Sequence, residues 1–265
     1  MASRFSIGIM GFGMVGGALG RYLSKAGIPF AAYDPAKNMQ TLEDINRQEL
    51  IFVCVPTPYV EGTGFDLSLV RQAVAALHGG KIVVIKSTVL PGTTEKLQKE
   101  FPQHRFLFNP EFLTESTADQ DMAYPDRQLI GYTEKSFTIA GDIMHLLPLA
   151  PFERVMPATA AETVKYFNNT WFATKVVFAN QIYDLCRKLG VDYDAVRDAA
   201  AADKRIGRSH LDVLHKGYRG YGGKCLPKDT RALIQLGDDL GAPQDLLKLV
   251  ESINSRLTGG TPPQA

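Results

Sequence analysis

One short segment carries the most reactive side chain of the sequence. Residues 220 to 229 read Gly-Tyr-Gly-Gly-Lys-Cys-Leu-Pro-Lys-Asp, so that Cys225 ends a glycine-rich turn. Pro227 is tolerated in the first turn of a helix, and we therefore expect a helix to begin next to Cys225. Unpaired helix amides and the helix dipole favour the nucleophilic thiolate, and glycines let a substrate approach the main chain. The alternative is an inert, half-buried thiol in a structural turn.

Composition indicates an ordinary globular protein. The chain has 265 residues, 45% hydrophobic and 22% charged, with a net charge of +1. This charge gives no support for nucleic acid or an anionic membrane as a partner. The first residues do not resemble a secretory leader, so we expect a cytoplasmic protein. The scattered Cys54, Cys186 and Cys225 argue against a disulfide framework and against a bound metal.

The amino-terminal residues have the pattern of a dinucleotide site. A short apolar strand at 5–10 leads into Gly11-x-Gly13-x-x-Gly16, which a helix-like stretch follows at 17–26. Asp34 ends the next strand, at 29–33, where a carboxylate accepts hydrogen bonds from the ribose hydroxyls of NAD and repels the 2′-phosphate of NADP. The pyrophosphate would lie on the helix amides. The alternative is an ordinary tight strand-to-helix turn with a capping aspartate.

Further apolar segments predict a doubly wound α/β fold. Strands are expected at 50–55, 81–86 and 105–108, with a helix at 67–77. Polar or proline-marked turns follow them at 55–58, 86–93 and 108–115, and in such sheets ligands bind outside the carboxyl ends of the strands. Glu111 and Glu115 are four residues apart, so on a helix they would share one side, suited to acid-base work or to solvation.

The second half changes to helices. They are expected at 160–189, 194–203, 227–240 and 243–257, followed by a flexible tail. We therefore predict a Rossmann-type domain at 1–155, a helical catalytic and dimerisation domain at 156–258, and a tail at 259–265. On the longest helix, Glu162, Lys165 and Asn169 stand at i, i+3 and i+7. The alternative for these residues is a solvated polar face.

Taken together, these motifs resemble the UDP-glucose/GDP-mannose dehydrogenase family over nearly the whole chain. The more specific parts are Gly222-Gly223-x-Cys225-Leu226-Pro227-Lys228-Asp229 and Asn109-Pro110-Glu111-Phe112-Leu113-x-Glu115. The resemblance implies a dimeric enzyme that oxidises the primary alcohol of a nucleotide sugar by four electrons with two NAD⁺ in succession. Cys225 would form a thiohemiacetal and then a thioester, which water cleaves.

The resemblance also implies roles for the remaining residues. Lys165 and Asn169 would bind the oxygen on which charge develops, Asp229 would position a water, Glu111 would be the base for hydrolysis, and Thr88 would hold the water. The implied cofactor site comprises Gly11, Phe12, Gly13, Met14, Val15, Gly16, Asp34, Val55, Pro56, Thr57, Ser87, Thr88 and Glu115. The implied substrate site comprises Glu111, Phe112, Leu113, Lys165, Asn169, Tyr221, Gly222 and an Arg205 that reaches the neighbouring subunit's substrate.

The chain departs from the family pattern in two ways. Family members continue past the central helix into another Rossmann-like domain that grips the nucleotide, whereas this chain ends soon after Leu257. The loop from Arg205 to Cys225 is longer than usual, and Arg219 stands where an aromatic or small apolar residue often precedes the glycines. Two other functions stay open. One is a two-electron β-hydroxyacid dehydrogenase, which needs no Cys225, and the other is an inactive NAD-binding or dimerisation module.

Overall fold

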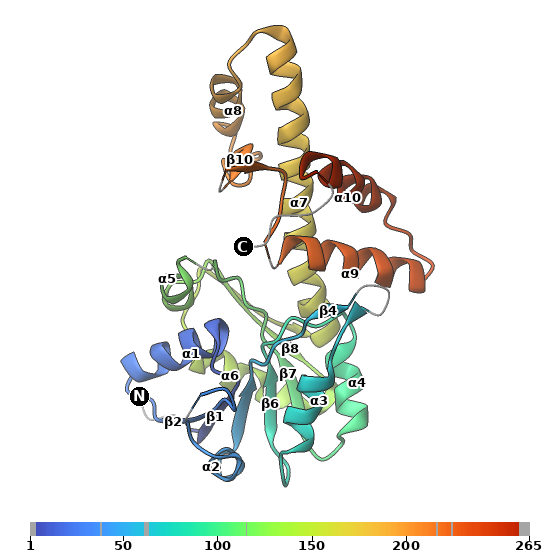
Figure 1. Cartoon of the computed structure of the whole chain (residues 1–265). Coiled ribbons are helices and arrows are strands. Elements are labelled where there is room, and N and C mark those ends of the chain that lie inside the picture. The colour runs from blue at the N-terminus through green and yellow to red at the C-terminus, as the bar shows by residue number, and fades with distance from the viewer. Residues whose placement is uncertain are drawn as a thin grey trace. The chain divides into compact units, whose positions relative to one another are not determined.

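The computed structural model describes residues 4–37, 39–60, 64–114, 116–215, 217–223 and 225–259. These residues form two compact units, Met1–Lys165 and Tyr166–Ala265. The division falls within α7 (Ala158–Leu189), which Figure 1 shows as one long continuous helix. Of the helices formed by the described residues, none is both long enough and apolar enough to cross a bilayer.

The first unit is built around a mostly parallel sheet, as predicted, which has seven strands, two more than the sequence indicated. The strand order is β2-β1-β3-β6-β7-β8-β9, in which β7 and β8 pair antiparallel and every other neighbouring pair is parallel. Because β1 lies between β2 and β3, the chain reverses its direction of winding there, and in such sheets a ligand binds beside the turns that follow these two strands. The strands are β1 (Ile7–Met10), β2 (Phe30–Tyr33), β3 (Leu50–Val53), β6 (Ile82–Ile85), β7 (Arg105–Phe108), β8 (Arg127–Tyr132) and β9 (Phe152–Pro157).

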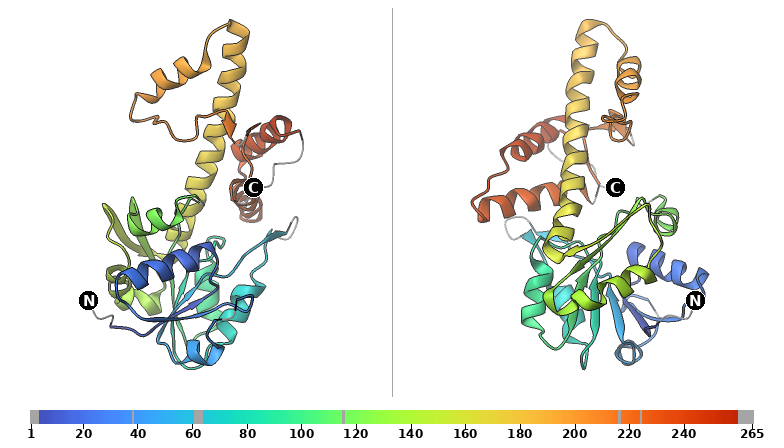
Figure 2. Two further views of the ribbon diagram at one scale, coloured as in Figure 1. Left: turned by 60° about the vertical axis from the view of Figure 1, so that its left-hand side comes forward. Right: turned by 180° about the vertical axis from the view of Figure 1, so that it is seen from behind.

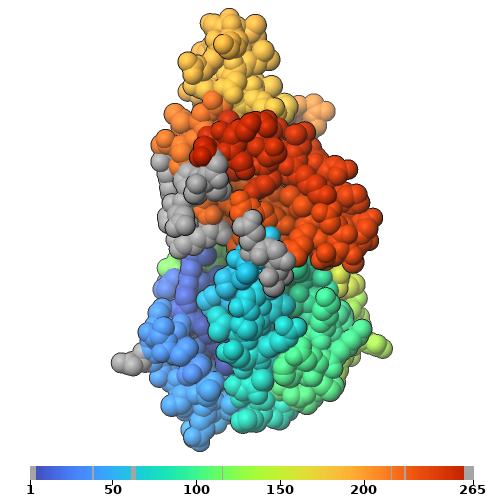
Figure 3. Space-filling model, turned by 45° about the vertical axis from the view of Figure 1, so that its right-hand side comes forward, coloured from blue at the N-terminus to red at the C-terminus, as the bar shows by residue number. Residues whose placement is uncertain are grey.

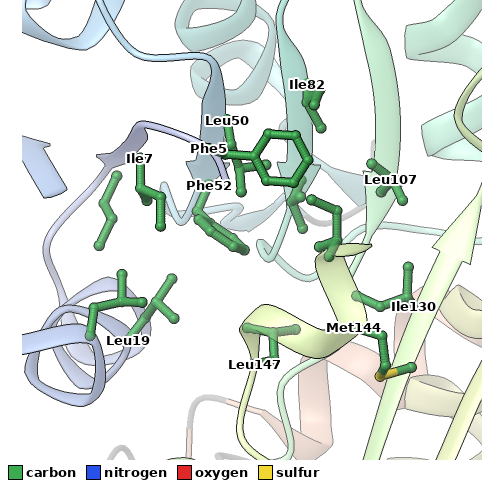
Figure 4. Close-up of a cluster of buried hydrophobic side chains, with 14 of the residues drawn as sticks. Phe5, Ile7, Leu19, Leu50, Phe52, Ile82, Leu107, Ile130, Met144 and Leu147 are labelled. Carbon is green, nitrogen blue, oxygen red and sulfur yellow. The ribbon is translucent and has the colours of Figure 1, made fainter. Parts of the chain in front are cut away.

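Alternating side chains of the central strands supply a separate apolar core on each face of this sheet. Leu50 and Phe52 of β3 point into one core, and Ile51 and Val53 point into the other. Figure 4 shows the first core, where side chains from the strands meet those of α1 and α6. The other elements of this unit are α1 (Met14–Lys25), α2 (Leu42–Asn46), α3 (Ser68–Ala75), α4 (Thr93–Glu100), α5 (Ala118–Ala123), η1 (Glu134–Ile139), α6 (Ala140–Leu146) and the hairpin β4 (Tyr59–Val60) and β5 (Gly64–Phe65).

The second unit is mainly helical, and each of its predicted helices is present. After α7 the chain turns back into α8 (Tyr193–Ala201), a small hairpin of β10 (Leu214–His215) and β11 (Tyr218–Arg219), then α9 (Leu226–Asp239) and α10 (Asp245–Leu257) (Figure 2). Two apolar clusters hold these elements on α7, one through α9 and α10 and one through α8. In the space-filling view the atoms of α9 and α10 form one continuous surface (Figure 3).

Candidate active site

The glycine turn after β1 is shaped by its own packing and leaves one side open. Gly11 has φ of 85°, and a Cβ there would lie 2.7 Å from the carbonyl oxygen of Cys54. A Cβ on Gly16 would lie 2.0 Å from the carbonyl oxygen of Gly11, whereas one on Gly13 would meet nothing within 4 Å. Gly11 and Gly16 are therefore required by the fold. Gly13 faces open space, where a ligand can approach the main chain.

Helix α1 presents its amino terminus at this turn. Gly13 is its N-cap, no side chain caps it, and its first turn holds no acidic residue. The amides of Met14 and Val15 and the positive end of the dipole are thus suited to a pyrophosphate. Asp34 lies beside the turn, since its Oδ2 accepts a hydrogen bond of 2.8 Å from the Phe12 amide. Phosphate donors and a ribose acceptor stand together here, so these residues fit a dinucleotide.

The turns after β3 and β6 are hydrogen-bonded to each other. The Thr57 hydroxyl donates to the carbonyl oxygen of Thr88 at 2.7 Å, and the Ser87 hydroxyl donates to the carbonyl oxygen of Val55 at 2.7 Å. Thr57 and Ser87 are buried, which leaves Thr88 and Pro56 as the more exposed parts of the two turns. The structure therefore brings the predicted residues of both turns together at one edge of the sheet.

A buried ion pair joins Glu111 to Lys165. Lys165 Nζ lies 2.8 Å from Glu111 Oε1 and also donates to the main-chain oxygen of Glu111 at 2.9 Å. Both side chains are less than a tenth exposed. Burial opposes ionisation of Glu111, but Lys165, the Leu113 amide and Lys86 together hold the pKa of this carboxyl below its usual value. Glu111 is thus a carboxylate, as a general base must be.

Residues 111 to 114 form an irregular turn and not a helix. The expectation that Glu111 and Glu115 share one side of a helix therefore does not hold. Glu115, the other carboxylate of that expectation, lies outside the described residues. The turn borders a cavity of about 350 Å³ that Lys86, Phe112 and Leu113 help to line. The structure thus places the predicted substrate residues Glu111, Phe112 and Leu113 on the wall of one cavity.

Lys86 and Arg127 were missed as site residues by sequence reasoning. Lys86 is buried at the end of β6, donates to Asn109 Oδ1 at 2.5 Å and lines the cavity beside Glu111. Burial lowers the pKa of Lys86, although the charge of Glu111 opposes this shift. The Arg127 guanidinium stacks 3.9 Å from the Phe112 ring centroid. A lysine directly after four apolar strand residues was the available signal for Lys86, whereas nothing local marks Arg127.

Glu162 caps a helix of the first unit. Its carboxylate accepts hydrogen bonds from the Gly92 amide at 2.6 Å, from the Thr94 amide at 2.8 Å and from the Thr94 hydroxyl at 2.6 Å, at the amino end of α4. Glu162, Lys165 and Asn169 are all buried, so the alternative of a solvated face is wrong for all three residues. Burial raises the pKa of Glu162 to about 7, and the hydrogen bonds limit that rise.

In the second unit, Cys225 lies where the sequence predicted. It is the exposed N-cap of α9, Pro227 stands in the first turn, and the Asp229 amide donates to the Cys225 carbonyl oxygen at 3.0 Å. The other two cysteines are less accessible. Cys186 is buried, and burial raises the pKa of Cys54 to about 12. The thiol at the start of α9 is therefore the one open to a reagent or substrate.

One turn into α9, Asp229 meets Asn169 of α7. The Asn169 amide donates to Asp229 Oδ2 at 2.5 Å, and Lys228 Nζ lies 3.0 Å from Asp229 Oδ1. Asp229 is fully buried and Asn169 nearly so. Two of the predicted catalytic residues, which lie 60 positions apart in sequence, are thus brought into direct contact.

The remaining predicted substrate residues of this unit are placed differently from one another. The Arg205 side chain is 89% exposed and pairs with Asp203, so it is open to a partner. Tyr221 is buried in the apolar cluster between α7, α9 and α10, and Gly222 is half-buried beside it. Within the part of the chain that the structure describes, no group of His, Cys, Asp or Glu side chains is arranged to hold a metal ion.

The fold and the glycine turn with Asp34 define a Rossmann-type dinucleotide-binding protein. Comparison with known proteins gives the family. Residues 35–145 match the NAD binding domain of the UDP-glucose/GDP-mannose dehydrogenase family, and residues 159–256 match its central domain. The chain belongs to this family, and its cofactor is NAD.

Several relatives show how far the similarity extends. The chain is 40% identical over 234 residues to a UDP-glucose 6-dehydrogenase of Pseudomonas aeruginosa, covering 81% of this chain and 50% of that protein. It is 34% identical to UDP-glucose 6-dehydrogenase TuaD of Bacillus subtilis, covering 80% of this chain and 47% of the relative. A solved UDP-glucose dehydrogenase from Pyrobaculum islandicum matches with a TM-score of 0.82 and 29% identity, over 95% of this chain and 68% of that one. The chain thus spans about half the length of the curated relatives it matches.

Proposed function

We propose that this protein is an NAD-dependent oxidoreductase of the UDP-glucose 6-dehydrogenase type, which converts the primary alcohol of a nucleotide sugar to a carboxylate. The observation that carries the proposal is the position of Cys225, exposed at the start of α9 and one turn before the buried Asp229. A two-electron dehydrogenase needs no such nucleophile. A four-electron enzyme needs one, because an aldehyde gives up a second hydride only after a nucleophile has added to it.

NAD, when bound, accepts hydride, and two NAD⁺ with one water convert one alcohol to one carboxylate, two NADH and three protons. In the first unit, Gly13 and the amino end of α1 would bind the pyrophosphate, and Asp34 would bind the ribose. The turns at Thr57, Ser87 and Thr88 would line the rest of the cofactor site, with Glu115. This assignment is supported by the open side of Gly13 and by the hydrogen bonds that join these turns.

Cys225 would act on the aldehyde that the first oxidation leaves. Its thiolate forms a bond to the carbonyl carbon, and the carbonyl oxygen takes up a proton to give a thiohemiacetal. Loss of hydride and of that proton leaves a thioester. Water then attacks the acyl carbon, the carbon–sulfur bond breaks, and the thiolate returns as the leaving group.

Four other side chains would support these steps. Lys165 and Asn169 would each stabilise the oxygen that becomes negative. Lys165 would do so through its ammonium group and Asn169 through its side-chain amide, both from α7. Glu111 would take the proton of the attacking water, and its lowered pKa supports this role because it keeps the carboxyl ionised. Asp229 and Thr88 would position the water. Arg205 would reach a substrate held by a second copy of the chain.

The test follows NADH while the purified protein is incubated with NAD⁺ and a panel of UDP sugars, GDP sugars and simple sugars. We expect two NADH per molecule of one nucleotide sugar from the wild type. The Cys225→Ser variant should form no carboxylate product. Cys54→Ser is the matched control, because the pKa of the Cys54 thiol is raised to about 12, which keeps it protonated and unreactive. One NADH per substrate together with an active Cys225→Ser variant would instead identify a two-electron hydroxyacid enzyme. No NADH across the panel would favour an inactive NAD-binding module.

A homodimer is part of the same proposal. The second unit exposes large apolar side chains along α7 at spacings of four and seven residues, which is the pattern of a helix-packing surface. They are Phe167, Trp171, Phe178, Leu185 and Leu189, each more than half exposed. Analytical ultracentrifugation should give a dimer for the wild type and a folded monomer for Trp171→Glu. A monomeric wild type at micromolar concentration would remove this part of the proposal.

A further inference from the structure

The short segment that leads to Cys225 is held by a side chain of α10, the last helix of the second unit. We name residues 219–223 together with Cys225 the thiol loop. Asn254 of α10 accepts a hydrogen bond from the Tyr221 amide through Oδ1 at 2.7 Å and donates through Nδ2 to the Tyr221 carbonyl oxygen at 2.9 Å. A side-chain amide offers the same donor and acceptor as a peptide group. Asn254 therefore pairs with Tyr221 as a neighbouring strand would.

This pairing is buried and closely fitted. Asn254 is 1% exposed and Tyr221 is 3% exposed. Gly220 has φ of 81°, and a Cβ there would lie 2.5 Å from Asn254 Oδ1. Any side chain at position 220 would thus push α10 away from the loop, and the two main-chain groups of Tyr221 would lose their partner.

Arg219 anchors the same loop on its opposite side. Its guanidinium forms a two-point contact with the Asp184 carboxylate, with distances of 2.8 and 2.9 Å. It also donates to Asn180 through Nε to Oδ1 at 2.9 Å and through Nη2 to the main-chain oxygen at 3.1 Å. Both acceptors belong to α7. A planar guanidinium with this many bonds fixes position as well as charge.

The Tyr221 side chain ties the loop to α9 as well. Its hydroxyl donates to Glu251 Oε2 at 2.6 Å, and the other oxygen of Glu251 accepts from Arg231 Nε of α9 at 2.6 Å. The Tyr221 ring and Leu226 pack in the same apolar cluster. Cys225 thus lies between two points, Tyr221 and Leu226, that are both held in the core of the unit.

We propose that Asn254 of α10 and Arg219 are positioning residues for the thiol step, and that they hold the thiol loop so that Cys225 stays at the amino end of α9. This inference rests on the proposed function for its catalytic consequence. It gives α10 a positioning role beyond its packing against α9. It also explains Arg219, whose guanidinium faces α7 and so serves the loop as an anchor.

The test measures how fast iodoacetamide alkylates Cys225 between pH 5 and 10, with the labelled peptide quantified by mass spectrometry. In Asn254→Ala we expect the alkylation rate at pH 7 to fall about five-fold or more, because Cys225 is no longer held at the amino end of α9. Ser252→Ala, an exposed change on the same helix, should match the wild type. Arg219→Lys keeps the charge and disturbs the core less. Its alkylation rate at pH 7 should fall in the same direction, but by a smaller factor.

Wild-type alkylation profiles in folded Asn254→Ala and Arg219→Lys proteins would overturn the inference. With a turned-over sugar, kcat should fall about ten-fold or more in Asn254→Ala while the KM for NAD⁺ is unchanged, because the cofactor residues belong to the first unit. A change in KM alone, with kcat unchanged, would also contradict the positioning role. If the wild type reduces no NAD⁺ with any sugar, the proposed function fails, whereas the alkylation profiles still decide the role of Asn254.

Discussion

Replacement of Lys165 by methionine should expose how strongly the first unit depends on the pair with Glu111. The variant keeps the length and packing of the side chain but removes the charge that lies 2.8 Å from Glu111 Oε1 and the bond to its main-chain oxygen. Both side chains are less than a tenth exposed, so Glu111 would be left as an unpaired buried charge. Such a change costs about 3–5 kcal/mol, a large part of the 5–15 kcal/mol by which domains are typically stable.

The cost should depend on pH in a defined direction. In the wild type the pKa of Glu111 is lowered, so its contribution to stability is present above the unfolded value near 4.5 and is lost as the pH falls. In Lys165→Met burial acts with far less opposition, so the pKa of the Glu111 carboxyl should rise above its usual value. The difference in unfolding free energy between wild type and variant should therefore be largest at pH 7 to 8 and should shrink towards pH 4.

Urea unfolding followed by circular dichroism measures these differences. The double variant with Glu111→Gln removes the unpaired charge, so it should be about 2–3 kcal/mol more stable at pH 7 than the sum of the single changes predicts. Lys188→Met, an exposed change on the same helix, is the matched control and should stay within about 0.5 kcal/mol of the wild type. A Lys165→Met protein as stable as the control, or a loss that is the same at pH 4 and pH 8, would refute the reasoning.

Three further outcomes follow from the described contacts. Because burial raises the pKa of Glu162 to about 7, the stabilisation linked to its proton is present near pH 4.5 and lost as the pH rises through 7. Relative to Glu162→Gln, the wild type should lose about 3 kcal/mol of unfolding free energy between pH 5 and 8. The same dependence of unfolding free energy on pH in both proteins would contradict this. Asp34→Ala should weaken NAD⁺ binding in calorimetry about ten-fold, and an unchanged Kd would argue against its place at the ribose. An aromatic disulfide reagent should modify one thiol rapidly in the native protein, at Cys225, while Cys54 and Cys186 react only on unfolding; rapid loss of all three would show that burial does not protect them.

Local patterns predicted the elements whose signals are strong. The central strands β1, β3 and β6 were predictable as apolar runs because both faces of each strand are buried. The start of α9 was predictable because a glycine turn, a cysteine and Pro227 mark it within eight residues. The long α7 was predictable from helical periodicity alone.

Strand β9 was missed because its side chains are mostly exposed, so its sequence Phe-Glu-Arg-Val-Met-Pro has neither an apolar run nor a clean alternation. The short α4 has a low apolar content, and its start depends on Glu162, which is 68 residues from Thr94. No local pattern shows such a cap. Lys86 is similar, since its burial follows from where β7 and its Asn109 pack, not from its neighbours in sequence.

Each of the two units holds one irregular turn by the same physical arrangement. In the first unit, Lys165 holds Glu111 by its carboxylate and by its main-chain oxygen, and in the second, Asn254 holds Tyr221 by both main-chain groups. The carboxylate and the thiol to which we assign chemistry lie on irregular turns, whose backbone would otherwise sample many conformations. A buried side chain from a helix distant in sequence restricts each turn, and the loss of either partner leaves buried polar groups unsatisfied. The residues proposed to perform the chemistry can therefore be predicted from short motifs, whereas the residues that hold them lie tens of positions away and are defined only by packing.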